Sequence, residues 1–338
     1  MARVARVPVS LVNVRTRDGI TLAGLMTEPR RRRGVALIWV HGLGSTFASG
    51  QALVAVLARR LGAAGIAYLK LDTRGHHVVA RTGKRLAGAA FERFGESVRD
   101  VRAMIDLARR AGYRRVILAG HSTGANKVLH YMARARDRRV AGLILLGPVS
   151  DIAGEITRVG RRELSRRVAV AERIARRDPD ALVPRAFGFW SARRYLSLYR
   201  PGAAEDVFQY YRAGRWPALR KIRVPLAVVI GERDEYLDRP AAALVEAFAR
   251  HATAARSFTG VVIPGALHGF AGQEDPLARA LVRWLARPLA PPRGARRRAG
   301  GRPGASAGSR GGRRPPRSRK RAPARSGRRA ESPPRSRR

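Results

Sequence analysis

Hydrophobic and polar positions alternate over the first part of the chain. Valine and leucine recur between polar residues from position 4 onward, the tripeptide Arg17-Asp18-Gly19 interrupts them, and apolar residues return over 20–26 before Pro29. Alternation of this kind is typical of strands with one buried face, and Asp-Gly is a common hairpin turn. The pattern predicts a β-hairpin over residues 4–29.

The pattern then changes to short, unbroken apolar runs, at 35–40, 67–71, 116–119 and 143–146. Such runs indicate strands that are covered on both faces. Between them lie segments with helical spacing of apolar residues, at 50–62, 96–110 and 125–136. Two further runs at 226–230 and 261–263 and a last helical segment at 276–286 continue the pattern. This alternation predicts an α/β fold with a mostly parallel central sheet and helices on both faces.

The long segment between the strands at 143–146 and 226–230 breaks the alternation. Nine of the chain's 21 aromatic residues lie between Phe187 and Trp216. A compact α/β domain has no need for so long a connection, so we expect residues 151–216 to form a helical cap inserted after the sixth strand. Its aromatic residues could form the cap's own core or line a substrate pocket. The core domain would then comprise residues 1–150 and 217–287.

The C-terminal part differs in composition from everything before it. From residue 291 onward there are 18 Lys or Arg residues, one acid and no aromatic residue. This composition predicts a disordered tail over 288–338, since such a segment cannot bury enough apolar surface to offset the entropy of ordering.

A net charge of +45 attracts nucleic acid and anionic surfaces. Without aromatics for base stacking we expect no specific recognition, and since only five of the 69 basic residues are Lys, GC-rich coding is an alternative explanation of the charge.

The same composition limits other chemistry and the location of the protein. The chain has no cysteine, which excludes disulfides, thiolate nucleophiles and cysteine metal sites. The N-terminus has the pattern of a strand and not of a signal peptide, and no apolar run approaches the ~20 residues of a membrane span. We therefore expect a cytoplasmic protein without a transmembrane segment.

The segment Gly120-His121-Ser122-Thr123-Gly124 matches the G-x-S-x-G nucleophile elbow. The pentapeptide is weak support by itself, because a second match occurs at Gly304–Gly308 in the predicted tail. Only the first match lies between a predicted strand and a predicted helix, as the elbow requires. This context predicts that Ser122 is the nucleophile of a serine hydrolase.

A serine hydroxyl needs a base to take its proton and an acid to orient that base. In the chain order Ser, acid, His, the histidines that come late enough are His251, within a predicted helix, and His268, in a loop after a strand. We predict that His268 is the base. For the acid we favour Asp234, in the loop after the strand at 226–230, over Asp151, which follows the strand at 143–146.

Two backbone N–H groups should stabilise the oxyanion, those of Thr123 after the nucleophile and of Leu43 in the loop after the strand at 35–40.

His41, at the start of that loop, is expected to pack within it. His76 and His77 lack a carboxylate cluster and are interpreted as turn residues. No phosphate-binding or dinucleotide-binding glycine motif occurs in a fitting context, so neither a cofactor nor a metal is expected.

Taken together, these motifs resemble the α/β-hydrolase superfamily from about residue 10 to 287. Segments 120–127, 146–151 and 201–208 are similar to the group of serine hydrolases that includes the siderophore (fusarinine) esterases. The resemblance implies the triad Ser122, Asp234 and His268 and a carboxylic ester, or a related small-molecule acyl compound, as substrate. The alternatives are an acyltransferase that uses the same triad and a non-catalytic binding protein that its basic tail attaches to an anionic surface.

Overall fold

An eight-stranded sheet forms the centre of the protein. The computed structural model describes residues 7–83, 85–214 and 216–287. The strands lie in the order β1-β2-β4-β3-β7-β8-β9-β10. Strand β2 pairs antiparallel with β1 and β4, and the other neighbouring pairs are parallel. Their bounds are β1 Ser10–Arg15, β2 Thr21–Thr27, β3 Val35–Val40, β4 Ile66–Leu71, β7 Arg115–His121, β8 Val140–Leu146, β9 Leu226–Gly231 and β10 Phe258–Ile263.

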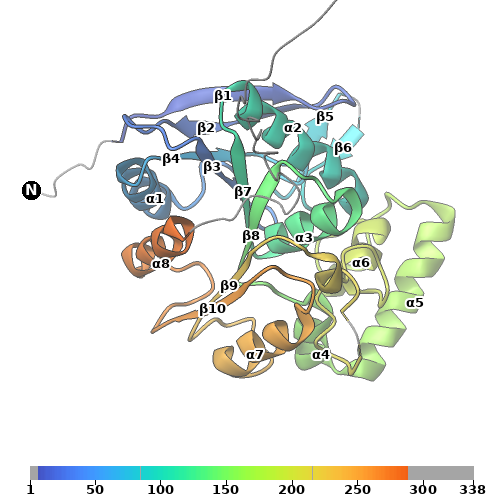
Figure 1. Ribbon diagram of the computed structural model, residues 1–338. Helices are drawn as coiled ribbons and strands as arrows, with labels where there is room; N and C mark the ends of the chain where they lie inside the picture. Colours follow the sequence, from blue (N-terminus) through green and yellow to red (C-terminus); the bar gives the residue numbers. More distant parts are fainter. Residues whose placement is uncertain (1–6, 84, 215, 288–338) are drawn as a thin grey trace, which may run out of the picture. The chain divides into compact units, whose positions relative to one another are not determined.

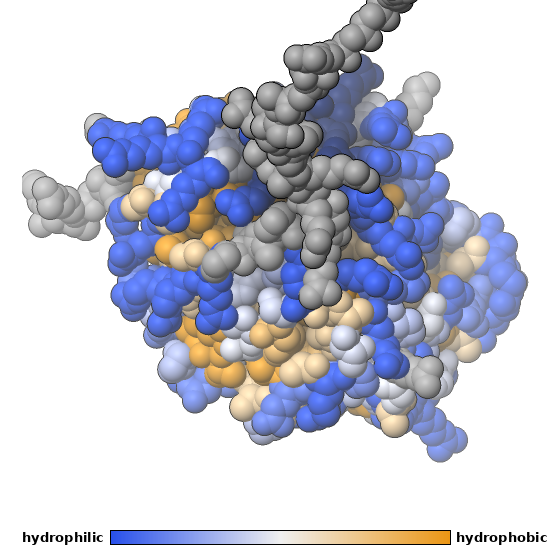
Figure 2. Space-filling model, viewed as in Figure 1, coloured by the Kyte–Doolittle hydropathy of each residue, from blue (hydrophilic) through white to orange (hydrophobic). Residues whose placement is uncertain are grey.

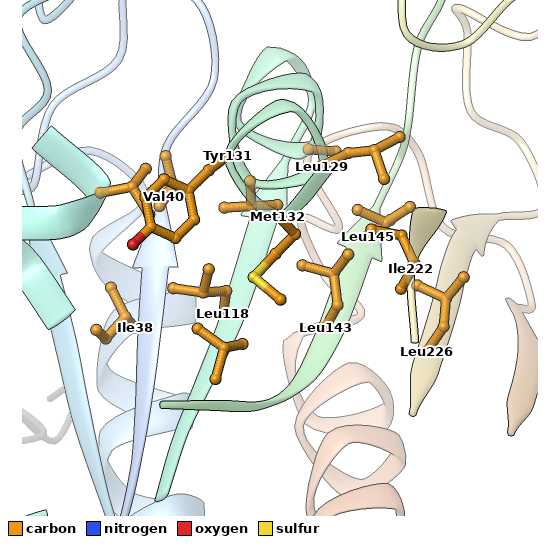
Figure 3. Packing of buried hydrophobic residues seen from close by; sticks show 14 of the residues in the cluster. Ile38, Val40, Leu118, Leu129, Tyr131, Met132, Leu143, Leu145, Ile222 and Leu226 are labelled. Carbon is orange, nitrogen blue, oxygen red and sulfur yellow. The ribbon is translucent and has the colours of Figure 1, made fainter. Parts of the chain in front are cut away.

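Helices cover both faces of this sheet (Figure 1). Helices α1 (Gln51–Ala63) and α8 (Glu274–Ala286) pack on one face, and α2 (Ser97–Arg110), α3 (Thr123–Ala135) and α7 (Ala241–His251) on the other. Each face of the sheet has its own hydrophobic core, and the side chains of β3 alternate between them. Leu37 and Trp39 pack with α1 and α8, whereas Ile38 and Val40 lie in the opposite core, which Figure 3 shows. The predicted α/β class and the mostly parallel sheet are confirmed.

The segment between β8 and β9 is helical. It contains α4 (Asp151–Val159), α5 (Arg161–Arg177) and α6 (Ala192–Tyr199). Part of its aromatic content forms a small core of its own around Phe187 and Tyr195. Other aromatic residues from the same segment pack into the main core instead, namely Phe208, Tyr210 and Trp216. Most of these side chains therefore serve packing.

Several details differ from the prediction or lie outside it. A small hairpin, β5 (Ala80–Thr82) and β6 (Arg85–Ala87), was not predicted, and three-residue turns of 3-10 helix occur at Phe94–Glu96, Arg185–Phe187 and Leu219–Lys221. The predicted tail at 288–338 and the second G-x-S-x-G match lie outside the described residues. Within the described part, no helix is both long and apolar enough to cross a bilayer. On the face seen in Figure 2, hydrophilic residues predominate, as the charge of the chain requires.

Candidate active site

Ser122 occupies a sharp turn between β7 and α3. Its backbone angles are φ 56° and ψ −130°, a conformation that costs a non-glycine residue free energy. Glycine on both sides makes the turn feasible. A Cβ atom on Gly120 would lie 2.3 Å from the carbonyl oxygen of Gly124, and one on Gly124 would lie 2.2 Å from that of Val40. Ser122 thus lies at the predicted turn between strand and helix, with a strained backbone.

His268 lies in the loop between β10 and α8, next to the loop that follows β9. Its Nδ1 is 2.8 Å from Oδ2 of Asp234, whose Oδ1 accepts a hydrogen bond from the backbone N–H of Tyr236 at 3.0 Å. The Asp234 side chain is fully buried. Since an ionised carboxylate can only accept, Nδ1 of His268 donates, and Nε2 of the neutral ring is left as an acceptor. This is the protonation pattern that a general base requires.

A cavity of about 690 Å³ brings the remaining predicted residues together. Ser122, His268, Leu43 and Thr123 all line it. Helix α3 begins at Thr123, so the backbone N–H of this residue has no partner within the helix. The glycine before Leu43 also lies against the nucleophile: a Cβ atom on Gly42 would be 2.8 Å from Cβ of Ser122.

Two further histidines pack around the site in their neutral form. Nε2 of His41 accepts the backbone N–H of Thr73 at 2.9 Å, and burial lowers the pKa of His41 to about 3. The His121 ring is tilted against that of His268, with 4.9 Å between ring centroids, and its Nε2 is 2.8 Å from the carbonyl oxygen of His268. Burial lowers the pKa of His121 to about 4. His41 packs within its loop as expected, whereas the role of His121 could not be predicted, because it fills a variable position of the motif.

The other candidate residues lie apart from the triad or make different contacts. Asp151, the alternative acid, lines the pocket at the start of α4, and it is Asp234 that contacts His268. His251 stacks on Trp216, with 4.4 Å between ring centroids. Nδ1 of His76 lies 2.9 Å from the carbonyl oxygen of Thr73 within its own turn. No group of three metal-binding side chains occurs among the residues that the structure describes.

A chain of buried charges extends behind the pocket and joins the core to the segment between β8 and β9. Nζ of Lys127, on α3, lies 2.7 Å from Glu92. Glu92 lies 3.6 Å from Arg194 on α6, which in turn contacts Glu205 at 3.1 Å. None of these four side chains is more than 1% exposed. Because buried charges are stable only when paired, these ion pairs position α6 relative to α3.

Comparison with known proteins agrees with the fold. A family model described as serine aminopeptidase, S33, matches residues 31–186, which span β3, the elbow and β8. Together with the sheet order, this match indicates that the chain has the α/β-hydrolase fold. No curated protein matches the chain at a significant level.

Solved structures with a similar fold include three esterases or related hydrolases, all at low sequence identity. The siderophore hydrolase EstB from Aspergillus fumigatus is 21% identical, with a TM-score of 0.60, over 82% of this chain and 97% of that one. Est1E from Butyrivibrio proteoclasticus is 20% identical, with a TM-score of 0.55, over 81% and 97%. The esterase Pf2001 from Pyrococcus furiosus is 16% identical, with a TM-score of 0.53, over 83% and 91%. These similarities establish the fold of the chain.

Proposed function

We propose that the protein is a serine hydrolase that cleaves a carboxylic ester or a related acyl compound. Ser122 is the nucleophile, His268 the general base and Asp234 the residue that orients it. The observation that carries the proposal is the strained Ser122 in one cavity with a histidine whose Nδ1 is held by a buried carboxylate. This arrangement of groups is the one that acyl transfer through a serine requires.

The reaction follows from the position of each group. The Ser122 oxygen attacks the substrate carbonyl carbon while Nε2 of His268 takes the hydroxyl proton. The carbonyl π electrons move to oxygen, and the N–H groups of Leu43 and Thr123 stabilise the resulting oxyanion. Collapse of the intermediate breaks the bond to the alcohol, which leaves with the proton from His268. Water then attacks the acyl-enzyme in the same way and releases the acid and free Ser122.

The choice of acid rests on contact and burial. Asp234 touches Nδ1 of His268 at 2.8 Å, so it can fix the tautomer and stabilise the imidazolium that forms during attack. Asp151 begins α4 and belongs to a different group of charges, described below. The acid role is therefore assigned to Asp234.

Residues 151–216 act in this proposal as a cap on the core domain 1–150 and 217–287. Helix α4 contributes Asp151, Gly154, Glu155, Thr157 and Arg158 to the wall of the pocket, and α6 contributes Tyr199. Tyr199 is the one aromatic residue of the segment, as far as the structure describes it, that lines the cavity. The substrate would consequently contact a mostly polar wall on the cap side.

Kinetics with 4-nitrophenyl esters of graded acyl length test the proposal. Wild type should hydrolyse at least part of the series, and Ser122→Ala should lose turnover and labelling by a fluorophosphonate. Full turnover by Ser122→Ala would refute the assignment. Product analysis with and without an added alcohol or amine acceptor separates a hydrolase from an acyltransferase, because only the latter diverts most of the acyl group to the acceptor at low acceptor concentration.

A further inference from the structure

The wall of the pocket is acidic, in a chain that is otherwise strongly basic. Three carboxylates line the cavity besides the triad, those of Asp151, Glu155 and Glu235, against a single basic residue, Arg158. Over the whole sequence, by contrast, basic residues outnumber acidic ones by 69 to 24. Random placement of charges would have given the reverse. The acidic wall therefore calls for an explanation in terms of what the pocket holds.

The three carboxylates differ in how their charge is balanced. Glu155 forms a bidentate pair with Arg158, at 2.9 and 2.6 Å, and is thus neutralised. The exposed Glu235 accepts the backbone N–H of His268 at 2.9 Å and so supports the catalytic loop. Asp151 has no ion-pair partner among the described residues. Of the three pocket carboxylates, Asp151 is thus the one that neither pairs with a cation nor contacts the catalytic loop.

The groups around Asp151 do not supply the missing cation. Behind it, the buried chain is already balanced, with two cations, Lys127 and Arg194, against two anions, Glu92 and Glu205. The charged groups that act most strongly on Asp151 are Glu205, Arg194 and Asp206, and the charge of Asp151 in turn acts on Tyr199 and Tyr210. Arg194 is the only cation in this set. When it is ionised, Asp151 therefore adds one negative charge in excess.

The surroundings make that excess charge costly. Burial, followed by the nearby charge of Glu205, raises the pKa of Asp151 to about 7. Asp151 is also the first residue of α4, where the helix dipole favours an anion, but such a contribution is small. A desolvated carboxylate is stable when a cation lies beside it, and here the open side of Asp151 is the pocket.

The pocket offers a second feature that suits a cation. The rings of Tyr199 and Tyr236 both line it. Burial and the charge of Asp151 both raise the pKa of the Tyr199 hydroxyl, and both residues line the same cavity. Faces of aromatic rings attract ammonium groups, and a ring beside a carboxylate is a common way to hold one. The two features together favour a positively charged ligand over a neutral polar one.

We propose that Asp151 is a specificity residue that binds a protonated amine on the substrate. The inference rests on the proposed function and narrows it: the preferred substrates are esters, or related acyl compounds, that carry an ammonium group within reach of Asp151 from the scissile carbonyl. Asp151 takes no part in bond breaking. The ammonium group of the substrate balances the charge of Asp151 when substrate binds.

Two pairs of isosteric esters test this proposal. One pair carries the charge on the acyl side, the 4-nitrophenyl esters of 6-aminohexanoate and heptanoate, and the other on the alcohol side, the acetates of 6-aminohexanol and heptanol. The measured quantity is the ratio of kcat/KM for the charged ester to that for the neutral one. Wild type should favour the charged member of at least one pair, and Asp151→Asn should lower that ratio by about tenfold or more. The charge-conserving Asp151→Glu should keep part of the preference.

The pH dependence of the same ratio separates recognition from a merely structural role. Effects of pH on the chemical step itself are common to both esters and cancel in the ratio. In wild type the ratio should fall as pH drops below about 7, where Asp151 becomes neutral, and in Asp151→Asn it should be flat. A carboxylate that only stabilises the start of α4 would change the melting temperature in Asp151→Asn and leave the ratio unchanged.

Failure of the inference and failure of the proposed function give different results. If wild type hydrolyses the neutral esters, but the ratio shows no preference or is unchanged in Asp151→Asn, the inference is wrong and the serine hydrolase stands. If no ester is hydrolysed, calorimetric binding of hexylammonium and of hexanol to the protein decides. Tighter binding of hexylammonium that is lost in Asp151→Asn supports the cation site, and equal binding of the two ligands overturns it.

Discussion

At the residue scale, two glycines next to site residues leave very different amounts of room for a side chain. A Cβ atom on Gly42 would lie 2.8 Å from Cβ of Ser122 and 3.3 Å from its hydroxyl oxygen, whereas one on Gly269 would meet nothing within 4 Å. Gly42→Ala should displace the nucleophile and lower kcat by about 10- to 100-fold, since small misplacements of a reacting group are costly. Gly269→Ala, beside His268, should change kcat little. Similar kinetics for the two variants would contradict the close contact.

The acid can be identified by a matched pair of substitutions. Asp234→Asn removes the charge that holds Nδ1–H of His268 and favours the wrong tautomer, so kcat for a neutral ester should drop by about 10³- to 10⁴-fold. Asp151→Asn should lower kcat for the same ester by less than about tenfold, because it is Asp234 that contacts Nδ1 of His268. A larger loss in Asp151→Asn than in Asp234→Asn would exchange the two assignments. Steady-state kinetics and circular dichroism of both variants provide the measurement.

At the scale of elements, the buried charge chain should dominate the attachment of α6 to the core. Burial alone would raise the pKa of the Glu92 carboxyl, but Lys127 and Arg194 lower it below its usual value. Glu92→Gln leaves two buried cations with one anion, which should reduce the free energy of unfolding by about 3–5 kcal/mol. The control is Glu163→Gln, which breaks a partly exposed pair with Arg166 on α5 and should have little effect. Urea denaturation followed by fluorescence measures both.

The same elements show what sequence patterns can and cannot reveal. The strands at 35–40 and 143–146 were predictable because burial on both faces requires unbroken apolar runs. The hairpin of β5 and β6 was not, since its strands have three residues each and no apolar alternation. Helical structure in 151–216 was foreseen, but the bounds of α4 to α6 were not.

The candidate site also contains residues that the sequence could place and contacts that it could not reveal. Ser122, Asp234 and His268 could be placed because each follows a predictable strand and parallel strands end at one edge of the sheet. The contact between Lys127 and Glu92 could not, because nothing in the sequence indicates which of many charged side chains become buried and meet. The acidic wall of the pocket was hidden for the same reason, since Asp151, Glu155 and Glu235 are brought to one cavity only by the fold.

At the scale of the whole molecule, the net charge of +45 predicts how the chain associates with nucleic acid. Any such binding should be electrostatic, so affinity should fall linearly on a log–log plot against salt and should be alike for two unrelated duplexes. Truncation after residue 287 removes 18 basic residues and should weaken binding strongly. Fluorescence anisotropy at graded salt measures this. Discrimination between the duplexes, or affinity that ignores salt, would contradict a purely electrostatic tail.

The pH dependence of stability combines opposing contributions from the interior. Burial keeps His41, His121 and His130 neutral, with pKa values of about 3, 4 and 4. The unfolded chain protonates these residues below about pH 6.5 while the folded chain does not, so stability is lost as pH falls from 6.5 toward 4. Each fully buried histidine contributes a slope of up to about 1.4 kcal/mol per pH unit.

Asp151 has the opposite effect on the pH dependence of stability, and this effect can be tested by substitution. Its pKa is raised to about 7 in the folded protein, so below that pH the folded state binds a proton that the unfolded state releases until about pH 4. Between pH 7 and 4 this proton uptake offsets part of the loss that the histidines cause. Asp151→Asn removes the offset and should steepen the fall of the unfolding free energy across that window, while His41→Gln should make it shallower. Urea denaturation of the three proteins at pH 8, 6.5, 5 and 4 measures the slopes, and an unchanged slope in Asp151→Asn would mean that the carboxyl is not desolvated in the folded state.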